Sequence, residues 1–179
     1  SGDDDLVLTG SDISVESSTS AKPVMTLFNS NADSSGATFK FKKDGTSAAT
    51  SDVIGNIDFL SEDAGAAATT YGRIQSTIVD VTAGGEQGGI DFYVAENDGT
   101  LTKGMSIQGA SSDGDITVDI STHDGTAGGL KLGGTLVTAT ASELNALDGF
   151  TGTVSSVSLS GSTDNTIATV TGANALAGE

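Results

Sequence analysis

Apolar and polar residues alternate along this chain in short runs, and this pattern constrains the fold more than any other feature. One run is 38–42 (TFKFK), in which lysines separate Phe39 and Phe41, and another is 90–94 (IDFYV). Successive side chains of a strand point to opposite faces of a sheet, so each run predicts a strand with one apolar face. Turn signals such as Asn97-Asp98-Gly99 follow several runs. Further strands are expected at 6–8, 13–15, 24–28, 53–60, 71–79, 101–107 and 116–120.

The chain contains few large apolar side chains to form these apolar faces. Leu, Ile, Val and Phe make up about 22% of the 179 residues, whereas Gly, Thr, Ser and Ala make up about half. This apolar content lies just above the level at which a highly charged chain stays disordered. The sequence therefore predicts an all-β protein of short antiparallel strands whose core is completed by side-by-side copies of the chain.

Charge and composition exclude several classes of function. The formal net charge is −17, with only seven basic residues, which argues against nucleic acid and anionic membrane surfaces as partners. No run approaches the ~20 apolar residues of a membrane span. There is no cysteine, which excludes disulfides, thiolate metal sites and cysteine nucleophiles.

Three stretches carry a resemblance to a known family. Residues 129–149 (GLKLGGTLVTATASELNALDG) resemble the linker module of bacteriophage tail fibres, especially those of marine phages. Residues 22–109 resemble a second module of the same proteins through 52–59 (DVIGNIDF), 71–78 (YGRIQSTI) and 88–101 (GGIDFYVAENDGTL). Residues 164–179 resemble the opening of a third module. The resemblance implies a homotrimeric, β-rich virion fibre without catalytic residues.

The pattern and the resemblance together divide the chain into four parts. We expect an N-terminal β shaft or linker at 1–20 and a β-rich, β-sandwich-like globular module at 21–110. A linker module at 111–149 should contain a short helix near 141–148, capped by Thr140 or Ser142 and ended by Gly149. Residues 150–179 should begin a further β module within an elongated, intertwined trimeric fibre. Because the chain does not begin with Met and this last module stays unfinished, we expect it to be a segment of a longer protein.

These features favour a structural segment of a phage tail (or head) fibre, a trimeric spacer between the virion and the host-recognition tip. The expected partners are two further copies of the chain, other virion proteins of the tail or capsid, and a host cell-surface glycan or protein. The expected location is the virion, outside the cell. One alternative is a receptor-binding module that contacts host glycan or surface protein. A second alternative is a bacterial surface adhesin or filament subunit.

Few residues qualify as sites, and we expect no cofactor. Asp98, Asp113 and Asp115 lie in acidic turns and are weak candidates for Ca²⁺, which prefers oxygen ligands. The glycine-rich stretch is a candidate exposed contact loop, formed by Gly84, Gly85, Glu86, Gln87, Gly88 and Gly89.

Other chemistry-bearing residues have a plainer interpretation. His123, the single histidine, is expected in an exposed turn, because adjacency to Ser121 and Asp124 does not make a catalytic triad. Lys40 and Lys42 are expected on the solvent side of their strand. The carboxylates near two strands do not indicate a glycosidase, because the chain has no Trp and only two Tyr to form a sugar platform. We therefore expect a protein that is not an enzyme.

Overall fold

The structure is a computed structural model that describes residues 8, 10, 12–45 and 47–146, together with the backbone of 168–172 and 175–178. It divides into two compact units, Ser1–Thr122 and His123–Glu179. The chain is all-β apart from one short helix among the described residues, which confirms the predicted fold class.

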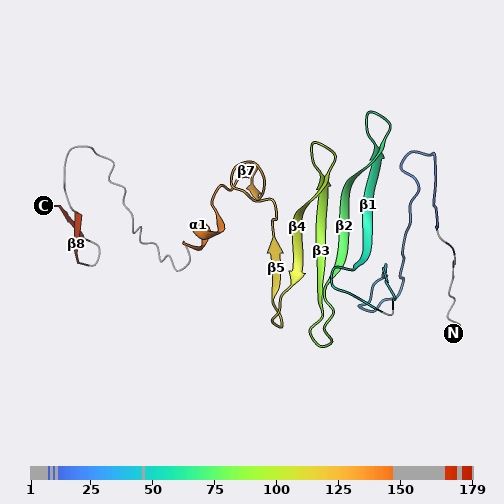
Figure 1. Cartoon of the computed structure of the whole chain (residues 1–179), viewed down its shortest axis with the longest axis horizontal. Coiled ribbons are helices and arrows are strands. Elements are labelled where there is room, and N and C mark those ends of the chain that lie inside the picture. The colour runs from blue at the N-terminus through green and yellow to red at the C-terminus, as the bar shows by residue number, and fades with distance from the viewer. Residues whose placement is uncertain are drawn as a thin grey trace. The chain divides into compact units, whose positions relative to one another are not determined.

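The first unit is built on a five-stranded antiparallel sheet in which the strands follow one another in chain order (Figure 1). Antiparallel neighbours need only short connections, and turn residues supply them here. Between the third and fourth strands, Gly99 takes a positive φ of 81° and Asp98 Oδ1 accepts a hydrogen bond from the Thr100 N–H. The strands are β1 (Val53–Glu62), β2 (Ala68–Asp80), β3 (Gln87–Ala95), β4 (Leu101–Gly109) and β5 (Ile116–Asp119).

The sheet is a single layer, so the sandwich-like packing expected for this module does not occur within the described chain. No apolar side chain of the described residues is buried. A sandwich needs a second sheet against the first, and the strands that follow the alternating pattern all join the same sheet. The core expected at 21–110 is therefore incomplete: the sheet has one apolar face, and no second sheet of the described residues packs against it.

The segment before β1 has the predicted alternation but no strand. Residues 13–15, 24–28 and 38–42 join no ladder, and 6–8 lies outside the described residues except for Leu8. Their large apolar side chains are exposed, including Val24, Leu27 and Phe28. The predicted boundary at 110 also differs from the structure, because β5 extends the sheet to Asp119 and the first unit ends at Thr122.

The second unit contains two small hairpins and the expected helix. β6 (Lys131–Leu132) pairs with β7 (Thr135–Leu136) through Gly133 and Gly134, which both have positive φ as a tight hairpin turn requires. α1 (Ala141–Asn145) begins at Thr140, whose hydroxyl accepts from the Glu143 N–H while the Glu143 carboxylate accepts from the Thr140 N–H. This confirms Thr140 as the cap, and the expected end at Gly149 lies outside the described residues. β8 (Ala168–Gly172) pairs antiparallel with β9 (Ala175–Gly178) where a further β module was expected.

Candidate self-association surface

One face of the five-stranded sheet is apolar, and the register of the strands assembles it. In one row Ile57 lies opposite Ile74, which lies opposite Phe92, which lies opposite Met105. A neighbouring row on the same face joins Ile90 to Ile107 and Val118, and another carries Phe59 and Val94 on either side of Gly72. Side chains two residues apart share a face, so these rows form one continuous surface, which we call the apolar face.

The apolar face is accessible in the single chain. Phe59, Val94 and Val118 expose 57%, 60% and 63% of their surface. The Phe59 ring lies beside Gly72 on the neighbouring strand, at ordinary contact distance from where a Cβ would stand. Large contiguous apolar surfaces of this kind mark places where proteins bind other proteins.

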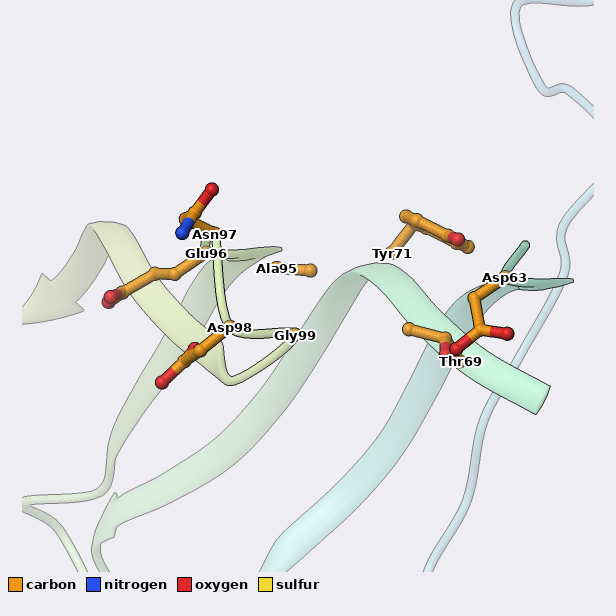
Figure 2. A pocket seen from close by; sticks show the side chains of 8 residues that line it. All are labelled: Asp63, Thr69, Tyr71, Ala95, Glu96, Asn97, Asp98 and Gly99. Carbon is orange, nitrogen blue, oxygen red and sulfur yellow. The ribbon is translucent and has the colours of Figure 1, made fainter. Parts of the chain in front are cut away.

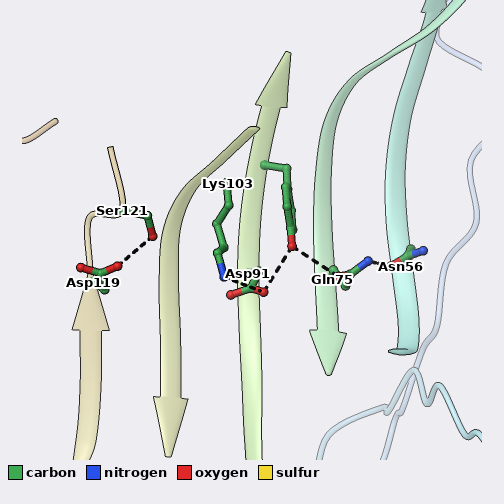
Figure 3. Close-up of polar contacts among 7 residues, drawn as sticks. Asn56, Gln75, Asp91, Lys103, Asp119 and Ser121 are labelled. Carbon is green, nitrogen blue, oxygen red and sulfur yellow. Dashed lines mark hydrogen bonds and ion pairs between the residues drawn. The ribbon is translucent and has the colours of Figure 1, made fainter. Parts of the chain in front are cut away.

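The opposite face, the polar face, carries a chain of hydrogen bonds that joins four neighbouring strands, β1 to β4 (Figure 3). Gln75 Nε2 donates to Asn56 Oδ1 at 3.0 Å, and the Tyr93 hydroxyl lies 3.4 Å from Gln75 Oε1 and 3.3 Å from Asp91 Oδ2. Lys103 Nζ approaches the same Asp91 oxygen at 3.4 Å. Asp91 and its cross-strand neighbour Ser106 are buried beneath these longer side chains. Burial, and then the Asp91 charge, raise the pKa of Tyr93, so the hydroxyl stays protonated and available as a donor.

An ion pair continues the polar face across β1 and β2. The Arg73 guanidinium donates to both carboxylate oxygens of Asp58, from Nε at 2.6 Å and from one terminal nitrogen at 2.7 Å. These hydrogen bonds lower the pKa of Asp58 below its ordinary value. Bidentate pairing fixes geometry as well as charge, so this pair holds the register of β1 against β2.

A polar hollow lies at the end of the sheet where the β1–β2 and β3–β4 turns meet (Figure 2). Tyr71 stands between Asp63 and Thr69 on one side and the residues of the Asn97–Gly99 turn on the other. Asp63 Oδ1 accepts from the Gly65 and Ala67 N–H groups, and Asp98 Oδ1 accepts from Thr100, so both carboxylates serve their own turns. The hollow therefore offers hydrogen-bonding surface but no paired acid and base.

The glycine-rich stretch is a shorter loop than the sequence predicted. Gly84, Gly85 and Glu86 lie in the exposed turn between β2 and β3, but Gln87, Gly88 and Gly89 already belong to β3. Gly89 is buried, and a Cβ there would stand 3.2 Å from both Thr77 and Val79 side-chain atoms and 3.4 Å from Gln108. The candidate contact loop is thus wrong for Gly89, whose missing side chain makes room for its neighbours on the polar face.

The candidate Ca²⁺ ligands are dispersed over two turns. Asp98 closes the β3–β4 turn, and Asp113 and Asp115 lie in the β4–β5 connection. Among the described residues no group of three or more His, Asp or Glu side chains is placed to hold a metal ion. The hydrogen bond that Asp98 accepts from Thr100 within its own turn accounts for an aspartate at this position.

His123 is half-buried and organises the loop that follows it, which corrects the expectation of an exposed turn residue. The Leu130 N–H donates to its Nδ1 at 3.3 Å, and Nε2 lies 3.2 Å from the Ala139 carbonyl. Because an N–H can only donate, Nδ1 must accept and the proton resides on Nε2. The ring therefore ties two points of the second unit together as a neutral imidazole.

Asp124 closes the same loop. Its Oδ1 accepts from the backbone N–H groups of Thr126, Ala127 and Gly128 at 2.8, 2.9 and 3.1 Å. These hydrogen bonds, led by that of Ala127, lower the pKa of Asp124 far below its ordinary value. The folded loop thus stabilises the ionised form of the Asp124 carboxylate.

This loop should persist in acid beyond the point where an ordinary aspartate protonates. A depressed pKa contributes stability that is present above the unfolded value of about 3.9 and is lost as the pH falls through the lower folded value. We expect the ¹³C carboxyl signal of Asp124 to titrate well below pH 3.9, together with loss of amide protection at Thr126 and Gly128. In an Asp124→Asn variant, which keeps the acceptor but cannot titrate, that protection should be independent of pH in this range. A titration of Asp124 at the ordinary value would contradict the assignment.

Comparison with known proteins identifies no relative: no family model, no curated protein and no solved structure matches the chain. Among the described residues, no helix has the length and apolar character needed to span a membrane.

Proposed function

We propose that this chain is a non-enzymatic structural segment of a trimeric virion fibre, a spacer between the virion and the host-recognition tip. One observation carries the proposal: the sheet has a continuous apolar face, and no apolar side chain of the described residues is buried. Apolar side chains that are not buried within one chain become buried when copies pack their apolar faces together. Three copies around an axis enclose all three faces, as the resemblance to tail-fibre modules implies.

The charge distribution supports the same proposal. The polar face carries the Asp58–Arg73 and Asp91–Lys103 pairs, and the net charge of −17 belongs to the chain as a whole. With the apolar faces turned inward, the charged faces form the outside, which keeps neighbouring fibres apart in solution. In salt water this repulsion is screened within roughly 10 Å, so it does not oppose assembly at the core.

The oligomeric state in solution tests this proposal. Light scattering coupled to size exclusion should give three times the 17.6 kDa mass of one chain, with a far-UV signal typical of β structure. A second run in 1 M NaCl should give the same mass, because apolar association is not weakened by salt. A monomer that retains native β signal at micromolar concentration would refute the trimeric spacer.

A further inference from the structure

We propose that the segment Thr38–Lys42 of each chain pairs with the open edge of β5 in a second copy, so that the chains exchange strands around the fibre axis. This inference rests on the proposed self-association and names the backbone contact that would join the copies.

The segment alternates like a strand but has no strand partner among the residues that the structure describes. The rings of Phe39 and Phe41 meet edge to face, with centroids 4.8 Å apart and planes at 87°, which places both side chains on one side of an extended backbone. Lys40 and Lys42 alternate with them. Within the described part of the chain, no backbone hydrogen bond joins 38–42 to any other residue. The five residues of the segment leave ten N–H and C=O groups unpaired with other backbone groups, and such a row is a template for a partner strand.

The segment lies against the apolar face of its own β1 rather than within its own sheet. A Cβ on Gly55 would stand 2.8 Å from the Phe41 ring, so Phe41 lies directly over that glycine, on the face that Ile57 shares. Further on, Lys43 Nζ lies 2.9 Å from Asp52. The segment therefore runs antiparallel to β1, because the later residue, Lys43, contacts the earlier residue, Asp52, whereas Phe41 lies over Gly55. A strand stacked on a sheet face is positioned to belong to a second sheet, and the proposed fibre supplies one from a neighbouring copy.

The edge of β5 offers the complementary row of backbone groups. β5 pairs with β4 on one side, and the Ala110 N–H bonds to the Asp115 carbonyl while the Ser121 N–H bonds to the Gly104 carbonyl. Because hydrogen-bonding direction alternates along a strand, the N–H and C=O groups of Ile116 and Val118 point away from β4. No described residue bonds to these groups.

The segment Thr38–Lys42 and β5 match in side-chain pattern and in charge. With Phe41 opposite Ile116 and Phe39 opposite Val118, both phenylalanines extend the apolar face. Lys40 then lies opposite Thr117, diagonal to Asp115 and Asp119, so the basic side of the segment meets the acidic side of the hairpin. Three of the seven basic residues of the chain lie at 40, 42 and 43, in a chain otherwise dominated by acidic residues.

The strand directions, and the closure of three chains into a ring, are both consistent with pairing of Thr38–Lys42 with the β5 of a neighbouring copy. β1 and β5 run in the same direction because they are alternate members of an antiparallel sheet (Figure 1). Rotation about an axis along the strands preserves direction, so a segment antiparallel to its own β1 is also antiparallel to the β5 of the neighbouring copy. Each chain donates one strand and receives one, which is a heterologous contact that closes into a ring. Pairing within one chain is excluded, because β1 and β5 stand four strand spacings apart, about 19 Å.

Cysteine cross-linking tests this contact cleanly, because the chain has no cysteine of its own. Thr117 would form a non-hydrogen-bonded pair with Lys40, with a Cα–Cα separation of about 4.5 Å that suits a disulfide. The double variant Lys40→Cys/Thr117→Cys, oxidised at low concentration, should migrate mainly as a covalent trimer on non-reducing gels. Each single variant alone should give no covalent species beyond a minor dimer. Mixing Lys40→Cys with Thr117→Cys chains before assembly should give covalent dimers of mixed composition, which mass spectrometry identifies.

The matched control is Lys40→Cys/Gln108→Cys. Gln108 lies directly opposite Thr117 on β4, so it shares the face and the level but stands one strand spacing farther from the segment. It should give less than about a tenth of the covalent trimer of the Thr117 variant. If light scattering shows trimers while the two double variants cross-link equally or not at all, the strand exchange is overturned and the spacer function stands. If light scattering shows only monomers, both proposals fail.

Discussion

Replacing Ile57 by aspartate is expected to convert the assembled protein to monomers. Ile57 lies in the row that runs through Ile74, Phe92 and Met105 on the apolar face, and it is 43% exposed in the single chain. In an assembly built on this face the new carboxylate would be buried without a partner, at a cost of roughly 3–5 kcal/mol per chain. Every 1.4 kcal/mol changes a dissociation constant tenfold, so the concentration needed for assembly should rise by more than about 100-fold. Sedimentation equilibrium at several protein concentrations measures this shift.

The neighbouring position supplies the control. Asn56→Asp adds the same charge one residue away, on the polar face, where the carboxylate can still accept the hydrogen bond from Gln75. This variant should assemble like the unaltered chain. Both positions are exposed in the single chain, so circular dichroism of the two monomers should be alike. Equal assembly of the Ile57→Asp and Asn56→Asp variants would show that the apolar face is not the interface.

Local patterns predicted the elements that depend on local chemistry. The alternation at 71–79 and 90–94 predicted two strands because each residue's face follows from its own position. Thr140 is one of the two caps that the sequence predicts for the helix, and the cap is local for the same reason, since both of its hydrogen bonds close within one turn. Alternation also predicts which side chains of each strand belong to the apolar face. It does not predict which of them lie opposite one another, because that depends on the register between strands.

Features that depend on distant partners were beyond the sequence. A strand at 38–42 was predicted from its alternation, but a ladder requires a second strand, and the described chain provides none. The glycines at 84–89 predict one loop, whereas Gly89 lies within β3, where side chains of Thr77, Val79 and Gln108 leave little room for a further side chain. The turn around His123 predicts an exposed ring, but its partners Leu130 and Ala139 lie 7 and 16 residues away, where a local pattern gives no sign of them.

Replacing Gly129 by alanine is expected to open the loop of the second unit. Gly129 has a φ of 119°, which side-chain-bearing residues rarely adopt, and an added Cβ would stand 2.5 Å from the His123 Cα and 2.7 Å from its Cβ. Because the first of these atoms is backbone, a change of rotamer cannot relieve the clash, and the loop must move. We expect a loss of about 3 kcal/mol or more in the free energy of loop opening, since the steric clash adds to the roughly 1–2 kcal/mol cost of a left-handed residue. Hydrogen exchange of the Leu130 amide, which donates to His123 Nδ1, should accelerate by at least about 100-fold.

The substitution Gly133→Ala separates the clash from the backbone cost. Gly133 also has a positive φ, at 57°, but nothing stands within 4 Å of its missing side chain. Alanine there should cost only about 1–2 kcal/mol and should loosen the β6–β7 turn without releasing His123. The His123 ring is the discriminating probe, because its Nδ1 and Nε2 signals report separately on the bonds to Leu130 and Ala139. Both signals should shift toward those of a free imidazole in Gly129→Ala and stay in place in Gly133→Ala. Unchanged ring signals in Gly129→Ala would mean that the loop tolerates a side chain at 129, and that the histidine does not hold it as described.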